Sequence, residues 1–337
     1  MSRKGNIAIF VPHLGCPNQC SFCNQRTITH TVSEPDGNFV RDECKKALEI
    51  NKDKDIECEI AFFGGSFTAI EYDYMTELLQ AASEFLDNEK ITGIRISTRP
   101  DAIDERILTT LKHYGVTAIE LGAQSMDENV LKLNRRGHTA EDVFKASEMI
   151  KSYGFSLGLQ MMTGLYGDSD ETIMKTARDF IKIKPDTVRI YPTVVLKHTY
   201  LDTLRREGKF IPRSAEDSVD ICADLIEMFK KEDIKVIRVG LHAEEWVKND
   251  ATGGAYHPAM RELCESRIFL KRIMKILNEQ DFPQGNIEIH VNPTNISKVI
   301  GQKKSNIVKM RNLGYNAKVK ADYSLDKEQI ILSSDRM

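Results

Sequence analysis

The sequence predicts an α/β fold, in which a parallel, partly closed barrel is followed by a small α+β domain. Strand-like and helix-like segments alternate up to about residue 240, and their order changes after residue 285. The 337 residues, 41% of them hydrophobic and 29% charged, can bury a large core without disulfides. We expect residues 1–245 to form the barrel with its C-terminal extension, residues 246–285 a connecting loop and basic helix, and residues 286–337 the small domain.

The barrel is expected from repeated strand-then-helix units. Its first strand is the apolar run 7–11, which is shorter than the ~7–15 apolar residues of a signal peptide. Further strands are expected at 60–63, 94–97, 118–121, 156–161, 187–191 and 236–239. Helices with apolar side chains at helical spacing are expected at 71–87, 104–114, 140–153, 170–183 and 215–232. Such units imply a parallel sheet with helices outside it and ligands at the carboxyl ends of its strands.

The composition excludes several classes of protein. No stretch approaches the ~20 apolar residues of a transmembrane helix, so we expect a cytoplasmic protein without membrane association. The formal net charge of −3 argues against a uniformly basic protein. In the reducing cytoplasm, cysteines are more often ligands or core residues than disulfides.

Three of the seven cysteines, Cys16, Cys20 and Cys23, lie close together in the sequence. Thiols this close cannot all be joined in disulfides without strain. A tetrahedral zinc site would need a fourth ligand, such as His13 or His30. An iron–sulfur cluster instead accepts three thiolates and can leave one iron open. The remaining cysteines fit helices or strands as small core residues: Cys44, Cys58, Cys222 and Cys264.

Polar residues follow the strands at the edge where ligands are expected. Gly64, Gly65 and Ser66 follow the second strand, and two glycines allow a backbone to approach a ligand closely. Gln124 follows the fourth strand, and Gln160 lies at the end of the fifth. Buried polar side chains in such places need partners, which a bound cofactor supplies.

The spacing C-x3-C-x2-C, with Phe22 before the last cysteine, resembles the radical SAM superfamily. The resemblance implies that Cys16, Cys20 and Cys23 bind a 4Fe–4S cluster whose open iron binds S-adenosylmethionine. It implies that one electron, from a donor such as flavodoxin or ferredoxin, cleaves the sulfonium and yields a 5′-deoxyadenosyl radical. It also implies a partial (β/α)6 barrel, with a full eightfold barrel as the alternative.

Four further motifs, at residues 97–101, 120–125, 134–139 and 190–195, make the resemblance more specific. They look like the radical SAM half of the catalytic subunit of Elongator, which modifies the wobble uridine of tRNA. That likeness covers about residues 5–245, with a shorter cluster loop in this chain. Because the chain has no room for the acetyltransferase domain of that subunit, we expect no acetyl-CoA-dependent product.

The same segments resemble the radical SAM half of oxygen-independent coproporphyrinogen oxidase. By that resemblance, Gly65 and Ser66 lie in the turn that holds the methionine amino group. Gln124 and Arg136 match residues that touch the nucleoside and carboxylate ends of the cofactor. Arg135 is an alternative to Arg136 for this role.

Two positions depart from the pattern of that enzyme, which has a glutamate and an aspartate there. This chain has Ser97 and Gln160 instead, and neither gives a charge-assisted hydrogen bond. The cofactor-binding residues that the resemblance implies are Phe22, Gly64, Gly65, Ser66, Ser97, Gln124, Arg136 and Gln160.

The C-terminal segment has a different pattern. Residues 286–291 alternate between apolar and polar side chains, which predicts a strand with one polar face. Helices are expected on either side of a turn at 300–304, and strands at 317–320 and 329–332. This β-α-α-β-β order resembles a small KH domain, in which a G-x-x-G loop clamps single-stranded nucleic acid. The resemblance implies RNA binding by Gly301, Gln302, Lys303 and Lys304, the last in place of a glycine.

The charge of this segment also differs from that of the rest of the chain. Residues 286–337 carry a net charge of +4, whereas residues 1–285 carry −7. Seven basic residues and no acidic residue lie between 297 and 320. A basic module on an acidic enzyme is typical of nucleic-acid binding.

Candidates for contact with the substrate lie in two loops. Residues 252–258 are expected to form a flexible loop that could close over a substrate through Tyr256 or His257. Lys197 and His198, after the sixth strand, are further candidates. We therefore expect a radical SAM enzyme, a transferase that modifies RNA (tRNA or rRNA). The alternatives are a small-molecule oxidoreductase of the coproporphyrinogen oxidase type and an RNA-binding protein with a structural cluster.

Overall fold

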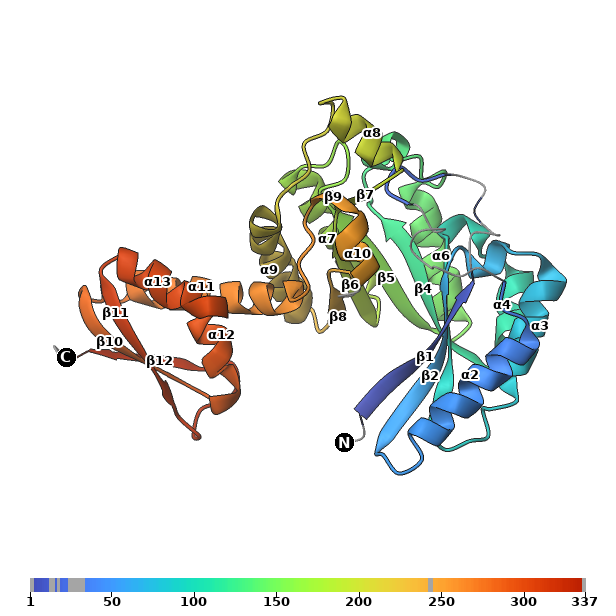
Figure 1. The fold of residues 1–337 in the computed structure, drawn as a ribbon, viewed down its shortest axis with the longest axis horizontal. Coiled ribbons are helices and arrows are strands. Elements are labelled where there is room, and N and C mark those ends of the chain that lie inside the picture. Colours follow the sequence, from blue (N-terminus) through green and yellow to red (C-terminus); the bar gives the residue numbers. More distant parts are fainter. Residues whose placement is uncertain (1–2, 12–15, 17–18, 24–33, 242–244, 335–337) are drawn as a thin grey trace.

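The computed structural model describes residues 3–11, 16, 19–23, 34–241 and 245–334. Its largest element is a seven-stranded sheet with the order β1-β2-β3-β4-β5-β6-β8, in which all neighbours are parallel (Figure 1). The strands are β1 (Arg3–Val11), β2 (Ile56–Gly64), β3 (Ile91–Thr98), β4 (Val116–Gln124), β5 (Ser156–Thr163), β6 (Thr187–Pro192) and β8 (Lys235–Val239). Each strand expected from the sequence is present, and each extends beyond its apolar run.

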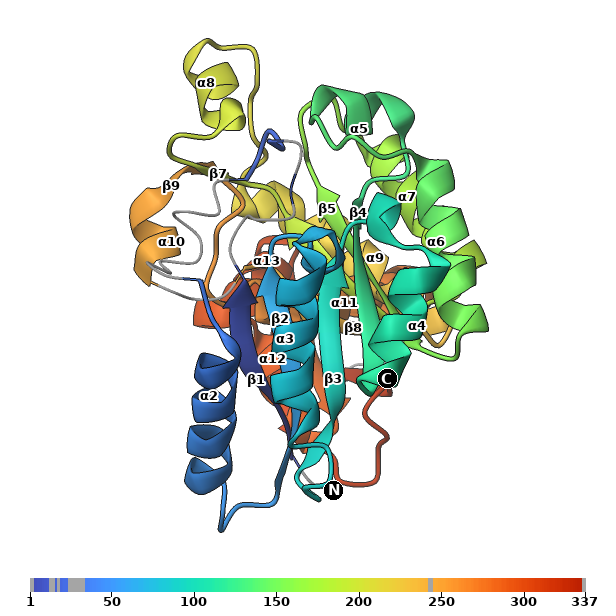
Figure 2. The ribbon, with the colours of Figure 1, turned by 90° about the vertical axis from the view of Figure 1, so that its right-hand side faces the viewer.

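Helices cover the convex face of this sheet (Figure 2). The expected helices are α3 (Tyr72–Ser83), α4 (Glu105–His113), α6 (Ala140–Ser152), α7 (Asp170–Ile183) and α9 (Ala215–Lys231), and the structure adds α2 (Gly37–Ile50) and the short α5 (Glu128–Leu133). Thr139, Ser169 and Ser214 cap the starts of α6, α7 and α9, and each forms a capping box. Each box satisfies backbone N–H groups at the first turn, so these starts are encoded locally.

Alternate side chains of each strand face the helices and the concave side of the sheet. Ile9 and Phe62 are buried under the helices. Phe63, the next residue of β2, faces Arg189 of β6, whose guanidinium carbon lies 5.5 Å from its ring centroid. These strands are four positions apart, which is about 19 Å in a flat sheet, so the sheet is strongly curled. Within the described residues β1 and β8 are edge strands, so the architecture is a half-barrel and not a closed eightfold barrel.

The segment after β8 differs from the flexible loop expected there. Ala251–Gly254 forms β9, which follows α10 (Glu245–Asp250) and pairs antiparallel with β7 (Val194–Leu196). Gly254 has a φ of 92°, and a Cβ atom there would lie 2.4 Å from the carbonyl oxygen of Thr193. Glycine therefore permits this close pairing. The prediction of a flexible loop was wrong for these residues because a short glycine-rich strand shows no apolar alternation.

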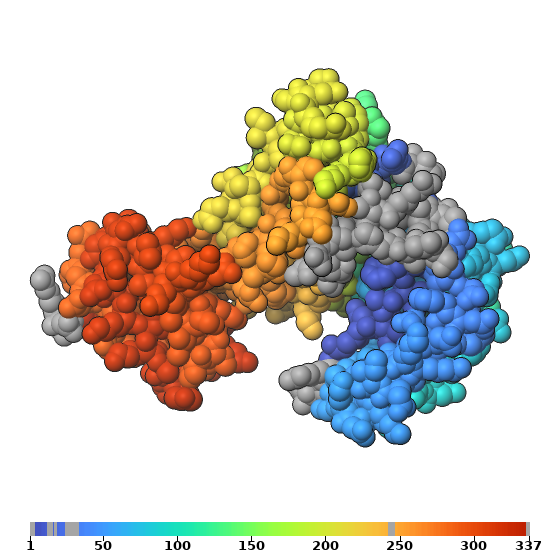
Figure 3. All heavy atoms as spheres, viewed as in Figure 1, coloured from blue at the N-terminus to red at the C-terminus, as the bar shows by residue number. Residues whose placement is uncertain are grey.

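The C-terminal domain has the predicted β-α-α-β-β order. Its elements are β10 (Gly285–Val291), α12 (Ile296–Ile300), α13 (Ser305–Asn312), β11 (Tyr315–Ala321) and β12 (Ile330–Ser334). The sheet order is β11-β10-β12, with β10 parallel to β11 and antiparallel to β12. Figure 3 shows this domain, in red, as a lobe beside the barrel.

Helix α11 (Met260–Glu279) joins the two parts. Cys264 and Ile268 belong to the barrel core, whereas Ile273 and Leu277 belong to the core of the C-terminal domain. Its basic side chains Arg267, Lys271 and Arg272 form ion pairs with acidic residues of α9, so they are not an open basic surface. In the part of the chain that the structure describes, no helix has the length and apolarity needed to cross a membrane.

Candidate cluster and cofactor site

The cysteine loop lies at the carboxyl ends of the strands, between α5 and α8 (Tyr200–Arg206) (Figure 2). Ser21 fixes it to both helices. Its N–H donates to the carbonyl oxygen of Asn134 at 3.1 Å, and its hydroxyl donates to Asn134 Oδ1 at 2.6 Å. Its carbonyl oxygen accepts from the N–H of Leu201 at 2.8 Å. Cys20 is buried, and Cys16 and Cys23 are half-buried.

The metal ligands predicted from the sequence stay a prediction. His13 and His30, the alternative fourth ligands for zinc, lie outside the described residues. Among the side chains that the structure does describe, no three of the types His, Cys, Asp and Glu are grouped so that they could hold a metal ion.

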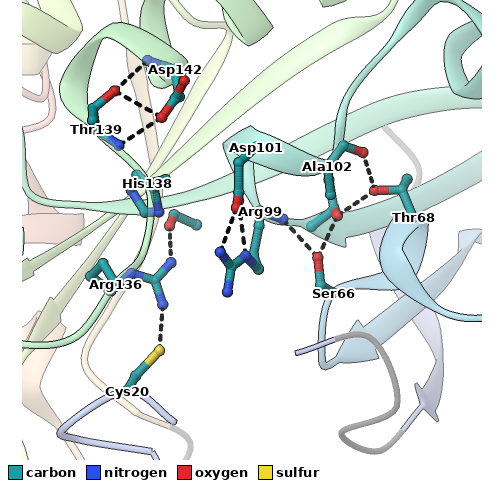
Figure 4. Close-up of polar contacts among 12 residues, drawn as sticks. Cys20, Ser66, Thr68, Arg99, Asp101, Ala102, Arg136, His138, Thr139 and Asp142 are labelled. Atoms are coloured by element: carbon teal, nitrogen blue, oxygen red, sulfur yellow. Dashed lines mark hydrogen bonds and ion pairs between the residues drawn. The ribbon is translucent and has the colours of Figure 1, made fainter. Parts of the chain in front are cut away.

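Arg136 connects the cysteine loop to β4 (Figure 4). Its Nη1 donates to Cys20 Sγ at 3.0 Å, and its Nη2 donates to the carbonyl oxygen of Gly122 at 2.5 Å. Its guanidinium carbon lies 5.7 Å from the ring centroid of Phe22. Arg135 points elsewhere and stacks on Tyr200, with 3.7 Å between guanidinium carbon and ring centroid. The structure therefore brings Arg136, and not Arg135, to the cysteines.

A second arginine approaches the cysteines from β3. The N–H of Arg99 donates to Ser66 Oγ at 3.1 Å, and its guanidinium donates twice to Asp101, at 2.9 and 2.5 Å. Burial raises the pKa of the Cys16 thiol, and the neighbouring Cys20 raises it further. The backbone N–H of Ser66 and the charge of Arg99 partly oppose that rise. The predicted Gly64-Gly65-Ser66 turn thus lies beside the first cysteine.

The two glycines of that turn serve a close backbone approach. Gly64 has a φ of 117°, and a Cβ atom there would lie 2.4 Å from the carbonyl oxygen of Val11. The N–H of Gly65 donates to the same oxygen at 3.0 Å. The turn therefore packs on the end of β1, and this packing sets the position of Ser66.

Several buried polar atoms around this loop have no partner among the described residues: Ser97 Oγ, Arg99 Nη1, Gln124 Oε1, Arg136 Nε and His138 Nδ1. Buried polar groups normally have partners, so this concentration indicates a polar ligand. The two guanidinium atoms suit a carboxylate, and the amide oxygen of Gln124 suits an amino or hydroxyl donor. Gln124 adopts a φ of 67°, an unusual value that is typical of functional sites.

His138 lies beside Arg136 and remains neutral. Its Nε2 lies 3.2 Å from the carbonyl oxygen of Ala123. Burial, reinforced by the charge of Arg136, lowers the pKa of His138 to about 4. At neutral pH its ring is therefore uncharged, and Nε2 must carry the proton in order to donate to the carbonyl.

Gln160 lies on the concave face next to a buried charge network. Its Nε2 donates to Glu120 Oε2 at 2.8 Å. Glu120 also accepts from Arg189 Nη2 at 2.8 Å and from Arg95 Nη1 at 3.2 Å. A carboxylate only accepts, so the amide nitrogen of Gln160 must face Glu120 and its oxygen is left for another donor.

The substrate-side candidates lie directly after β7 and directly before α11. Lys197 Nζ donates to the carbonyl oxygen of Asn249 at 2.8 Å, which ties β7 to the end of α10. His257 Nδ1 accepts from the N–H of Ala259 at 3.0 Å, at the start of α11. Tyr256 is half-buried in the same turn. Their catalytic roles stay predictions.

Sequence reasoning did not select Arg99, His138 or Asn134 as site residues. All three lie in motifs that carry the family resemblance, at 97–101 and 134–139. The signal was therefore present in the motifs, but the individual roles required the fold.

Comparison with known proteins identifies relatives. Residues 10–180 match the family described as the radical SAM superfamily, and residues 185–269 match the radical SAM C-terminal domain. The tRNA uridine(34) acetyltransferase of Methanocaldococcus infernus is 30% identical over 183 residues, which are 48% of this chain and 34% of that protein. Human Elongator complex protein 3 is 30% identical over 190 residues, 50% of this chain and 35% of that protein.

The tRNA uridine(34) acetyltransferase of Dehalococcoides mccartyi is 25% identical over 252 residues, which are 65% of this chain and 55% of that protein. The chain thus spans between about one third and about half of these relatives. Among solved structures, the Elp3 of Methanocaldococcus infernus with an N-terminal deletion has a TM-score of 0.63 at 22% identity. The match covers 84% of this chain and 64% of the chain in that structure. This likeness supports the half-barrel fold.

Proposed function

The chain belongs to the radical SAM superfamily, and we propose that it uses its radical chemistry to modify RNA, either tRNA or rRNA. Its cofactors are a 4Fe–4S cluster and S-adenosylmethionine, which together supply a carbon-centred radical. The observation that carries the proposed RNA substrate is an exposed basic turn in the C-terminal domain. The names of the curated relatives agree with it.

The residues of the half-barrel fit these cofactors. Cys16, Cys20 and Cys23 would hold the cluster. Arg99 and Arg136, whose guanidinium groups have unpaired buried atoms, would bind a carboxylate, and Gln124 would accept a hydrogen bond from the nucleoside. Burial of these groups excludes water and keeps charge-assisted bonds strong.

The turn between α12 and α13 supports the proposed nucleic-acid clamp. Gly301 has a φ of 78°, and a Cβ atom there would lie 2.5 Å from Ser305 Oγ. Lys303 and Lys304 are exposed and adopt left-handed conformations, with φ values of 51° and 64°. Lys304 thus takes a conformation that favours glycine, at the position where a G-x-x-G loop has its second glycine.

These two lysines also differ from two of their basic neighbours. Lys298 pairs with Glu265 of α11 at 3.0 Å, and Lys309 pairs with Glu216 of α9 at 3.1 Å. Among the described residues, Lys303 and Lys304 form no ion pair, so their charges remain available for phosphates. This availability distinguishes a binding surface from a solvated face that is already neutralised.

Two alternatives make different predictions. A small-molecule oxidoreductase would turn over without RNA, and an RNA-binding protein with a structural cluster would not cleave S-adenosylmethionine. We propose that a small reduced protein, such as flavodoxin or ferredoxin, supplies the electron in either enzymatic case. Formation of 5′-deoxyadenosine separates the enzymes from the binding protein, and dependence on RNA separates the two enzymes.

The decisive experiment is mass spectrometry of nucleosides from tRNA and rRNA of a deletion strain and its parent. We expect one modified nucleoside to disappear and to return with the wild-type gene. Complementation with the Lys303→Ala/Lys304→Ala variant should restore it poorly. The matched control is Lys52→Ala/Lys54→Ala, which removes two exposed lysines from the loop between α2 and β2. This variant should restore the nucleoside fully. Identical nucleosides in all strains would refute the proposal.

A further inference from the structure

Two aromatic side chains lie at the carboxyl ends of β1 and β2 without being part of the core. Phe10 and Phe63 are paired in the sheet register, and their ring centroids are 6.2 Å apart. Phe10 is 39% exposed, whereas its neighbour Ile9 is fully buried under the helices. What distinguishes Phe10 from a single exposed apolar residue is that its ring pairs with a second ring at the edge of the sheet where ligands bind.

The concave face places a fixed cation across from these rings. The guanidinium carbon of Arg189 lies 5.5 Å from the ring centroid of Phe63. Arg189 cannot swing away, because its Nη2 donates to Glu120 at 2.8 Å. Glu120 is 1% exposed and is itself held by Arg95 and Gln160. Arg95, Glu120, Gln160 and Arg189 thus form a fixed polar wall beside the rings of Phe10 and Phe63.

The acids of this wall are paired with arginines. Arg95 pairs with Glu59 at 2.8 Å and with Glu120 at 3.2 Å, and Arg189 pairs with Glu120. Two acids and two bases thus form one paired network, and Arg238 of β8 lies at its end, near Tyr191. Exposed rings beside a wall of paired polar groups suit a planar, unsaturated ring.

We propose that Phe10 and Phe63 form a stacking subsite for the target nucleobase of the RNA substrate. The inference rests on the RNA modification proposed above, and it assigns residues that neither the motifs nor the family resemblance singled out. In this arrangement the basic turn at Lys303 and Lys304 would bind phosphates, and the two rings would stack on the base. Base–aromatic stacking requires the base to be turned out of its own stack, as RNA-modifying sites demand.

The test is photo-crosslinking of the cluster-loaded, full-length protein under anaerobic conditions to tRNA that contains 5-bromouridine, followed by mass spectrometry of the crosslinked peptides. We expect the crosslink to map to the peptides that contain Phe10 or Phe63. Phe10→Leu should reduce its yield about fivefold or more, as expected for the loss of one stacked base. Phe10→Trp, which keeps a stacking surface, should retain it.

The matched control is Phe39→Leu, because Phe39 is 43% exposed on α2, outside the proposed subsite. It should leave crosslinking and product formation unchanged. If wild-type protein modifies RNA but Phe10→Leu and Phe63→Leu crosslink as well as wild type, the stacking subsite is wrong while the proposed function stands. If wild-type protein neither binds nor modifies RNA, both are overturned.

Discussion

Arg136 donates from Nη1 to the sulfur of Cys20 at 3.0 Å, across 116 positions of the sequence. The same guanidinium donates from Nη2 to the carbonyl oxygen of Gly122, so it fixes the cysteine loop to the end of β4. A single side chain therefore joins the cysteine loop to the edge of the sheet where Gln124 lies. Its remaining Nε is buried and has no partner among the described residues.

This geometry predicts different roles for two adjacent arginines. Arg136→Ala should lower the affinity for S-adenosylmethionine about tenfold or more, because a hydrogen bond to a charged group contributes roughly 1.5–3 kcal/mol. Gln124→Ala should weaken binding through the loss of its amide acceptor. Arg135→Ala is the control, since its side chain stacks on Tyr200. Equilibrium binding to cluster-loaded protein measures the effect, and equal affinities of the two arginine variants would contradict it.

The three clustered cysteines are expected to be the only thiols that the cluster requires. Replacing Cys16, Cys20 or Cys23 by Ala should abolish both the iron content of the anaerobically reconstituted protein and its cleavage of S-adenosylmethionine. Cys44→Ala is the control, because this thiol is fully buried on the inner face of α2. Iron analysis and visible absorption measure the outcome. A full cluster in the triple variant, or stoichiometric zinc in wild type, would refute the assignment.

The sequence predicted most of the half-barrel because its strands are continuous apolar runs and its helices have regular apolar spacing. β9 was not predicted, because Gly253 and Gly254 remove the alternation of apolar and polar residues on which strand prediction depends. The cysteine loop could be singled out because the spacing of its cysteines is local, whereas their role as ligands stays a prediction. The choice between Arg135 and Arg136 could not, because it depends on the left-handed φ of 55° at Arg135, which turns the two side chains apart.

The joint between the two lobes offers a stability prediction. Arg267 is 12% exposed and binds Glu216 of α9 at 2.6 Å as well as Asp220. Arg267→Ala should lower the free energy of unfolding by about 1–2 kcal/mol, between the values for exposed and fully buried pairs. Lys275→Ala is the control, because this side chain is 71% exposed and lies 3.6 Å from its partner. Its effect should stay below about 0.5 kcal/mol in urea unfolding.

The same joint makes a truncation near Gly285 an unsuitable test of RNA binding. Such a truncation would expose Ile273 and Leu277, which now lie in the core of the C-terminal domain. The loss of RNA binding could then follow from unfolding or aggregation. Point variants in the turn at Lys303 and Lys304 avoid this ambiguity, because both side chains are exposed.

His138 predicts a loss of stability in acid. Its pKa is lowered to about 4 in the folded protein, mainly by burial, whereas an unfolded chain has about 6.5. The unfolded state therefore binds a proton first as pH falls, and stability is lost between about pH 6.5 and pH 4. Urea unfolding of cluster-free protein should show a shallower pH dependence for His138→Gln than for wild type, by up to about 3 kcal/mol across this window. Parallel curves would show that His138 titrates normally.

We expect Lys304→Gly to weaken RNA binding without lowering the stability of the fold. Its φ of 64° costs a residue with a side chain about 1–2 kcal/mol, and glycine would remove that cost. Glycine also makes the unfolded chain more flexible, by about 0.4–1 kcal/mol, so Lys304→Gly should leave the unfolding free energy unchanged or raise it by up to about 1.5 kcal/mol. Lys304→Val should lower it, because a β-branched residue tolerates this conformation poorly.

For RNA, Lys304→Gly should remove one phosphate contact. The slope of the logarithm of affinity against the logarithm of salt concentration should then fall by about 0.7 for single-stranded RNA, because fewer counterions are released on binding. Lys303→Ala should change the slope equally without relieving the strain at position 304. Binding measured at several salt concentrations, alongside urea unfolding, separates the two effects. Each lysine is exposed and forms no ion pair among the described residues, so each is expected to contribute to the slope. An unchanged slope in both variants would therefore show that the turn does not bind phosphates.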